Sequence, residues 1–318
     1  MVASTHDEEI ELFHEVLKRK FNVTMNLDIS SHLGISMDKL PDGRIRLRQS
    51  KLLDEIFKEY PTDNRVKYPT QPRSRKGTVD TTPYNQTEYL KLLGKLMYMT
   101  NSRPDILTSL SYAGTKSLAP TADDFQILLE IVGYLKETED QGLILFTREN
   151  GQNQDIQCTC YVDAFYLSHS DGRSHTGYCI GLSPVGIEPK SYYYNKSSKQ
   201  KLVSTSSTHA EMRALYELTV TIIFVTYLLE EIGRPIKVPV LIFEDNQPVL
   251  DLTEEMSGTK SSKNFMMLTN FIQEQVRAGL IHLVKVDTKS NLSNVLTKIL
   301  TGQEFLHSLS KILGTSPH

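Results

Sequence analysis

The order of strand-like and helix-like runs after residue 155 limits this chain to a small set of folds. The strand runs come first, at residues 156–168, 175–182 and 190–196. The runs that follow are a long helix at 208–232, a strand at 238–243, helices at 247–256 and 263–278, a strand at 281–286 and a closing helix at 298–313. A strand meander that then alternates with helices predicts an α+β unit whose mixed sheet is covered by helices.

The first 150 residues have mainly helical periodicity. Helices are expected at residues 6–21 and 50–60 and, in two or three pieces, between 86 and 139. Strand runs at 27–38 and 44–48 flank the turn cluster Pro41-Asp42-Gly43, which is typical of a hairpin. Residues 61–82 are rich in Pro, Thr, Ser, Lys and Arg, and this composition predicts an extended connector.

A polar, Gly- and Asn-rich stretch at residues 147–155 separates these two parts. A length of 318 residues suits about two domains. We therefore expect one domain over residues 1–150 and a second over 151–318.

The overall charge gives no general attraction to nucleic acid, since 35 basic and 38 acidic residues leave a net charge of -3. Any such binding must come from a local basic patch. The odd, clustered cysteines Cys158, Cys160 and Cys179 favour reduced thiols in an intracellular protein over a disulfide framework. Neither a signal sequence nor a membrane span is recognisable, so we expect a cytoplasmic or nuclear protein without membrane contact.

Three acids lie at informative places in the second half, and each has an ordinary structural explanation. Asp163 interrupts the first strand run, where a solvated strand face would accept it. Glu211 follows Thr208 by three residues and fits a capping box. Asp245 ends a strand before a helix, where a helix N-cap is expected. Each acid alone is therefore weak evidence for a functional site.

Together, the three acids predict a metal site. The middle of the first strand, the start of the long helix and the end of the next strand can converge on one edge of a mixed sheet. Carboxylates gathered so closely repel one another unless cations lie between them. Two divalent ions can activate a water molecule and stabilise the leaving oxygen of a phosphodiester, which is nuclease chemistry.

A basic stretch with interleaved aromatic residues provides candidate contacts to nucleic acid. These candidates are Lys190, Tyr192, Tyr194, Lys196, Lys199, Lys201 and Arg173. Lysines can pair with phosphates, and tyrosines can stack on sugars or bases. The alternative is a strand with a solvated lysine face and tyrosines in the core.

Several motifs resemble, in order and spacing, the ribonuclease H domain of Ty1/copia-type retrotransposon polyproteins. They are Tyr161-Val-Asp-Ala, Ser206-Ser-Thr-His-Ala-Glu211, Asp245-Asn-Gln and Asn294-Val-Leu-Thr-Lys298. Motifs of the first half resemble the end of the palm, the thumb and the connection of the reverse transcriptase in the same polyproteins. They are Leu33-Gly34-Ile35, Leu93-Gly94-Lys95-Leu96-Met97-Tyr98, Asn101-Ser-Arg103-Pro104-Asp105-Ile106 and Tyr134-Leu135-Lys136.

The resemblance implies a helical thumb and connection segment followed by a ribonuclease-H-like domain with a mixed five-stranded sheet. It implies that Asp163, Glu211 and Asp245 are catalytic acids binding Mg²⁺ or Mn²⁺, and that the substrate is the RNA of an RNA:DNA hybrid. The family's polymerase motif Tyr-x-Asp-Asp is absent, so we expect no polymerase activity. A complete retrotransposon polymerase is an expected partner.

Some positions depart from the family pattern. The fourth acid of the family is Asn294 here, and an amide oxygen binds a hard cation with less charge than a carboxylate does. Phe165, Asn264 and His209 also replace residues typical of the family. These departures favour, as an alternative, a catalytically lapsed transposon remnant or a hybrid-binding module.

A zinc deaminase is a rival interpretation, because His209-Ala-Glu211 matches its His-x-Glu signature. It fails because all three cysteines precede His209, so the required downstream Pro-Cys-x-x-Cys is missing.

Overall fold

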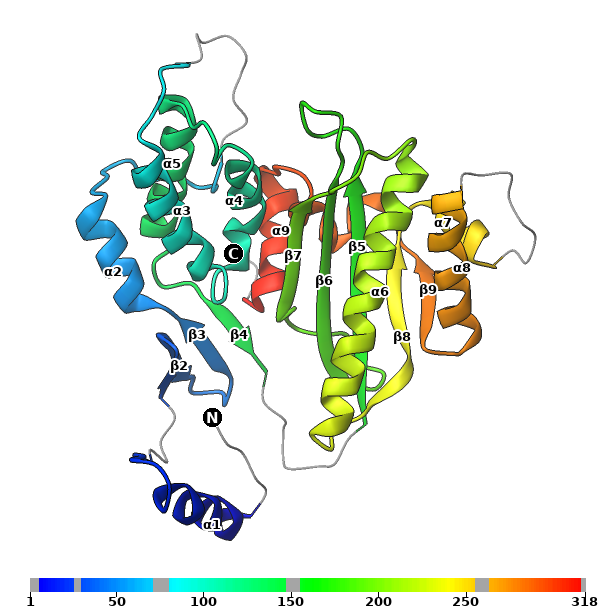
Figure 1. Cartoon of the computed structure of the whole chain (residues 1–318), viewed down its shortest axis with the longest axis horizontal. Coiled ribbons are helices and arrows are strands. Elements are labelled where there is room, and N and C mark those ends of the chain that lie inside the picture. Colours follow the sequence, from blue (N-terminus) through cyan, green and yellow to red (C-terminus); the bar gives the residue numbers. More distant parts are fainter. Residues whose placement is uncertain (1–5, 26–29, 71–79, 147–154, 255–262, 316–318) are drawn as a thin grey trace.

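Two separate sheets organise the chain in the computed structural model, which describes residues 6–25, 30–70, 80–146, 155–254 and 263–315. The smaller sheet has the strand order β1-β2-β3-β4, and the larger has the order β7-β6-β5-β8-β9. A group of helices lies beside the smaller sheet, and the long helix α6 runs across the larger one (Figure 1).

The smaller sheet contains the predicted hairpin and two features that were not predicted. Its strands are β1 (Ser31–His32), β2 (Ile35–Lys39), β3 (Ile45–Arg48) and β4 (Leu143–Leu145). Gly43 adopts a positive φ of 84° in the hairpin turn between β2 and β3. The run expected at 27–38, of which 27–29 lie outside the described residues, is broken by a turn at Leu33 and Gly34, both of which have positive φ. β4 pairs with β3 across almost one hundred residues of sequence.

Among its described residues the first half has five α-helices, and all but the first pack into one apolar cluster. They are α1 (Asp7–Lys18), α2 (Ser50–Glu59), α3 (Gln86–Met99), α4 (Leu107–Gly114) and α5 (Ala122–Glu137). α1 buries none of its residues, whereas α3 and α5 bury side chains such as Leu96 and Ile131 completely. Asn85 caps α3, and Thr121 forms a capping box with Asp124 at the start of α5. The helical first half is thus built as its periodicity predicts.

The larger sheet is mixed, as expected. Its strands are β5 (Ile156–Phe165), β6 (His175–Pro184), β7 (Tyr194–Lys199), β8 (Ile236–Glu244) and β9 (Ile281–Lys285). β5 pairs antiparallel with β6 and parallel with β8, so the central strand joins the meander to the parallel part. β7 begins four residues later than predicted, after the buried Tyr192.

Helices cover both faces of this sheet. They are α6 (Ser207–Glu231), α7 (Gln247–Glu254), α8 (Lys263–Arg277) and α9 (Gly302–Leu313). Alternation along β5 sends Cys160 and Val162 into a cluster with α6 and α8, and sends Tyr161 into the cluster of α3, α5 and α9. The predicted fold class, α+β with a mixed five-stranded sheet and flanking helices, is confirmed.

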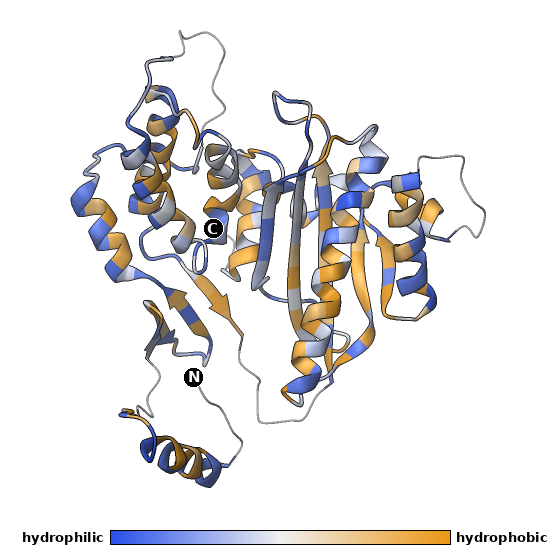
Figure 2. Cartoon of the chain, in the orientation of Figure 1, coloured by the Kyte–Doolittle hydropathy of each residue, from blue (hydrophilic) through white to orange (hydrophobic). Residues whose placement is uncertain are grey.

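Helix α6 has polar residues near both ends and a mainly apolar stretch between them (Figure 2). By length and composition alone it is the single helix of the described residues that could cross a membrane. Its first half packs on the sheet through buried residues such as Leu215 and Leu218. A core helix of a soluble protein passes the same test, so this property is weak evidence for a membrane span.

Candidate metal centre

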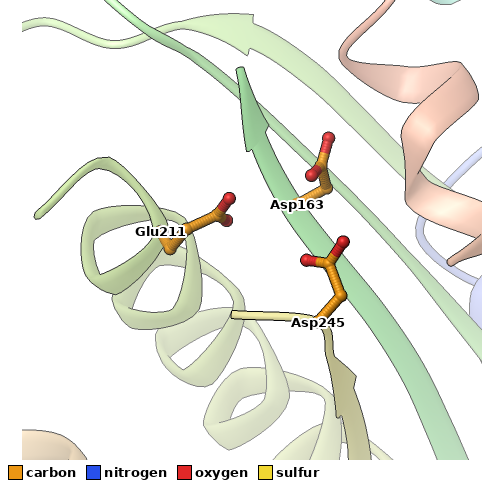
Figure 3. Close-up of side chains that lie close together, drawn as sticks. All are labelled: Asp163, Glu211 and Asp245. Carbon is orange, nitrogen blue, oxygen red and sulfur yellow. The ribbon is translucent and has the colours of Figure 1, made fainter. Parts of the chain in front are cut away.

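The three predicted acids come together at one edge of the larger sheet (Figure 3). Asp163 lies near the end of β5, Glu211 in the first turns of α6, and Asp245 directly after β8. Because β5 and β8 are parallel neighbours, their carboxyl ends bring Asp163 and Asp245 to the same edge. One carboxylate oxygen from each acid lies within 4.8 Å of those of the other two.

The ordinary explanations for these acids do not hold in the structure. Asp163 is only 2 % exposed, so its face of the strand is not solvated. Ser206, not Thr208, caps α6 by accepting from the backbone N–H of His209, which leaves Glu211 outside the cap. Asn246, not Asp245, accepts from the backbone N–H of Val249 at the start of α7. The three carboxylates are thus free of local capping roles.

The segment carrying Asn294 contacts Asp163 directly. The Thr297 hydroxyl donates a hydrogen bond to Asp163, and the Lys298 ammonium lies 3.2 Å from Asp163 Oδ2. Lys298 also donates to Asn294 Oδ1 at 2.5 Å, while Asn294 Nδ2 donates to the Thr288 carbonyl at 2.5 Å. The amide that replaces the fourth acid therefore binds a lysine, and this lysine also contacts the first acid.

Burial makes negative charge costly in this site. It raises the pKa of Asp163, against the opposing effects of Lys298 and the Thr297 hydrogen bond. Burial also holds the pKa of Glu211 well above its usual range, and the nearby charge of Glu244 is the next largest cause. Both shifts are those expected for carboxylates that have been taken out of water.

Glu244 is a further buried acid that sequence reasoning missed. It is fully buried at the end of β8, directly before Asp245, and burial raises its pKa to about 8. A signal was present in the sequence, because Val240, Ile242 and Glu244 alternate on one face of the strand. An acid on an otherwise apolar, buried face of a strand is unfavourable for folding, so its presence there indicates a functional role.

Helix α4 holds the Asn294 segment against the sheet. The Thr108 hydroxyl donates to the Val295 carbonyl at 2.6 Å, and the Tyr112 hydroxyl donates to the Thr297 carbonyl at 3.1 Å. Gly177, opposite Asp163 in the β5–β6 pair, lets this segment approach closely. A Cβ atom at Gly177 would lie 2.6 Å from Thr297 Cγ2. The first half of the chain therefore helps to position the site.

The candidate nucleic-acid residues are not all exposed. Tyr192 is fully buried, with its ring edge-on to Tyr161, so a contact between Tyr192 and nucleic acid is a wrong prediction. The alternative, a tyrosine in the core, is correct at this position. Tyr194 is 39 % exposed and stacks on Tyr178.

The basic candidates have acidic or aromatic neighbours. Lys199 and Arg173 both pair with Asp171, at 2.7 Å and 3.5 Å. Lys190 is exposed and lies over the Phe146 ring. The remaining candidates, Lys196 and Lys201, oppose the rise in the pKa of Glu217 that burial causes. Their contacts with a hybrid stay a prediction.

The donor set of the site fits a hard divalent cation. Mg²⁺ and Mn²⁺ prefer oxygen ligands, and three carboxylates supply them here. Glu211 Oε2 is buried and has no hydrogen-bond partner within the described part of the chain, so it is available as a ligand atom. Cys158, Cys160 and Cys179 are free and buried on β5 and β6. The group of possible metal ligands among the described residues contains none of them, which gives no support to a zinc deaminase site.

Comparison with curated proteins finds retrotransposon relatives over most of the chain. The Retrovirus-related Pol polyprotein from transposon RE1 of Arabidopsis thaliana is 29% identical over 302 residues, which cover 93% of this chain and 20% of the relative. The Truncated transposon Ty1-A Gag-Pol polyprotein of Saccharomyces cerevisiae is 22% identical over 224 residues, 69% of this chain and 18% of the relative. The chain spans about a fifth of the length of these relatives. No protein-family model matches the sequence.

Similar solved structures come from reverse transcriptases and ribonucleases H. The foamy viral protease-reverse transcriptase dRH in complex with double-stranded DNA covers 91% of this chain and 44% of its own, with 13% identity and a TM-score of 0.44. LC11-RNase H1 in complex with an RNA/DNA hybrid covers 42% of this chain and 88% of its own, with 12% identity and a TM-score of 0.32.

Proposed function

We propose that this chain, a homologue of the Pol polyproteins of Ty1/copia-type retrotransposons, hydrolyses the RNA strand of an RNA:DNA hybrid with the help of divalent metal ions. The observation that carries the proposal is the convergence of Asp163, Glu211 and Asp245, which come from three different elements. Their order in the sequence also matches the ribonuclease H motifs of the family.

The proposed roles follow from the positions of the acids. Asp163 and Asp245, at the ends of adjacent parallel strands, would bind the cations from the sheet, and Glu211 would bind from the helix side. Bound Mg²⁺ or Mn²⁺ would supply activation of a water molecule and stabilisation of the leaving oxygen. Thr297 orients the Asp163 carboxylate through its hydroxyl, which keeps this ligand in a fixed rotamer.

A hybrid-binding protein without catalysis is the second candidate, and one contact favours it. The Lys298 ammonium lies between Asp163 and Asn294, so a cation of the chain itself already neutralises part of the site. A metal ion that binds beside Asp163 must then either displace the Lys298 ammonium or bind despite its positive charge. We also propose that the chain lacks polymerase activity and would act beside a complete retrotransposon polymerase.

A cleavage assay tests the nuclease proposal. Purified chain is incubated with an end-labelled RNA:DNA hybrid and either Mg²⁺ or Mn²⁺, beside the variants Asp163→Asn and Asn294→Asp. We expect wild type to cleave only the RNA strand, Asp163→Asn to be inactive, and Asn294→Asp to cleave faster at low metal concentration.

Three outcomes separate the candidates. Cleavage by Asn294→Asp alone identifies a lapsed enzyme, because one restored carboxylate then suffices to recover activity. Binding of the hybrid without cleavage by either protein supports the hybrid-binding module. Cleavage that persists in Asp163→Asn contradicts the metal centre proposed above.

A further inference from the structure

Glu244 is buried beside the three acids and has no role in the site described above. It ends β8 and is 0 % exposed, so its carboxyl group has been taken completely out of water. Val240 and Ile242 on the same face of β8 pack in the cluster that contains Ala210 and Met212, the neighbours of Glu211 in α6. Glu244 therefore faces the helix that carries Glu211.

The hydrogen bonds of Glu244 are incomplete. Oε1 accepts from the backbone N–H of Asn246 at 2.9 Å. Among the described residues, none provides a hydrogen bond to Oε2 of Glu244 or to Oε2 of Glu211. A buried carboxylate oxygen without a partner is unfavourable, so each of these two oxygens would be stabilised by a bound cation.

The charges of the four acids act on one another. After burial, Glu244 is the strongest influence that raises the pKa of Glu211, followed by Asp163 and Asp245. Asp245 and Asp163 in turn raise the pKa of Glu244, against the hydrogen bond from the Asn246 backbone. Glu244 lies outside the group of three acids whose oxygens come within 4.8 Å of one another, and it borders this group from the side of α6.

The structure assigns Glu244 as a fourth carboxylate of the metal centre, with its negative charge taking the place of the one that Asn294 lacks. This inference rests on the proposed binding of divalent cations at Asp163, Glu211 and Asp245. Asn294 carries no charge and binds the Lys298 ammonium, so the segment from Asn294 to Lys298 contributes positive rather than negative charge to the site. A carboxylate at 244 restores the balance from the opposite side of the cluster.

The test measures cation affinity and not catalysis. Mn²⁺ is titrated calorimetrically into the full chain, as wild type and as Glu244→Gln, which keeps the shape of the side chain and removes its charge. We expect Mn²⁺ to bind Glu244→Gln about 10–100-fold more weakly than wild type, the range found for residues that support metal ligands. The matched control is Glu217→Gln, a partly buried acid farther along α6, which should bind Mn²⁺ as wild type does.

Two further measurements separate a metal role from a purely structural one. Thermal unfolding without metal should show an equal or higher Tm for Glu244→Gln, because a neutral amide replaces a buried ionisable carboxyl group. The double variant Glu244→Gln/Asn294→Asp should recover Mn²⁺ affinity, since it again has four carboxylates.

The possible failures are distinguishable. If wild type binds Mn²⁺ and Glu244→Gln binds it equally well, Glu244 is not part of the centre and this inference alone is overturned. If Glu244→Gln has a lower Tm but binds Mn²⁺ as tightly as wild type, Glu244 has a structural role only and this inference is likewise overturned. If wild type itself binds no Mn²⁺, the proposed metal centre is wrong and the inference falls with it.

Discussion

Burial of His175 couples the stability of the chain to pH. His175, the first residue of β6, is fully buried and stacks on Tyr112 of α4. Its ring nitrogens lie 2.8 Å from Ser197 Oγ and 3.0 Å from His169 Nε2. Burial, reinforced by His169, lowers its pKa to about 3. In the unfolded chain His175 has an ordinary histidine pKa of about 6.5. Between this pH and pH 3 the unfolded chain therefore binds a proton at His175 that the folded chain does not bind. His175 therefore costs stability as pH falls from about 6.5 toward 3.

We expect His175→Phe, which keeps the stacking but cannot be protonated, to lose less stability on acidification than wild type. Below pH 6.5 the difference in unfolding free energy should change in favour of the variant by about 1.4 kcal/mol per pH unit. Urea unfolding at pH 7.5, 6.0 and 5.0 measures it, with the exposed His307→Phe as control. Parallel pH profiles of wild type and His175→Phe would show that His175 is protonated in the folded state.

Single site residues could be predicted where the order of strands and helices along the sequence determines which residues meet. Asp163, Glu211 and Asp245 could be proposed because strand ends and helix starts meet at sheet edges. The contacts of Lys298 with Asp163 and Asn294 form because a segment distant in sequence packs against β5. Local sequence patterns could not predict this packing. Tyr192 was misassigned because aromatic residues among lysines have the same composition in a core strand and on a binding surface.

At the scale of elements, Gly177 controls how closely the Asn294 segment approaches β6. We expect Gly177→Ala to destabilise the chain by about 1–3 kcal/mol, because the new Cβ would overlap Thr297 and Leu296 and displace them. Loss of the Thr297 hydroxyl from Asp163 should also weaken Mn²⁺ binding. Urea unfolding and calorimetric titration measure the two effects.

Gly94→Ala is the matched control for this change. Gly94 lies in α3, and nothing lies within 4 Å of the position that a Cβ atom would take there, so alanine should stabilise the helix by about 0.5–1 kcal/mol. Unchanged stability and unchanged Mn²⁺ affinity in Gly177→Ala would mean that the Asn294 segment is not held by this close approach.

Helices with strongly periodic apolar residues were predicted well. Short elements, and elements that form by pairing with a distant part of the chain, were not. The helices α2 and α6 begin and end close to the expected residues, because their apolar faces repeat over several turns. The helices α3, α4 and α5 fill the stretch 86–139, where two or three helices were expected. β4 has three residues and exists through pairing with β3, which no local pattern records. The turn at Leu33 was missed because leucine is unusual at positive φ.

At the scale of the whole molecule, one apolar cluster joins the two halves of the sequence. It unites Leu96 of α3 and Ile131 of α5 with Tyr161 of β5 and with Phe305 and Leu309 of α9. The last helix of the chain thus packs on helices of the first half (Figure 1). The division into residues 1–150 and 151–318 stays a prediction, and the shared cluster indicates that the two parts unfold together.

A core substitution in the first half tests this coupling. Leu96 is completely buried, and Leu96→Ala should destabilise the chain by about 2–5 kcal/mol. If the halves unfold as one unit, hydrogen exchange should accelerate equally in α3 and in the strands β5 and β8 of the proposed metal centre. The control is Leu118→Ala, the same change at a side chain that is 91% exposed, which should leave exchange unchanged. Acceleration confined to α3 and its neighbours, with β5 still protected, would show two independent domains, and the metal centre would then fold without the helices that contact it.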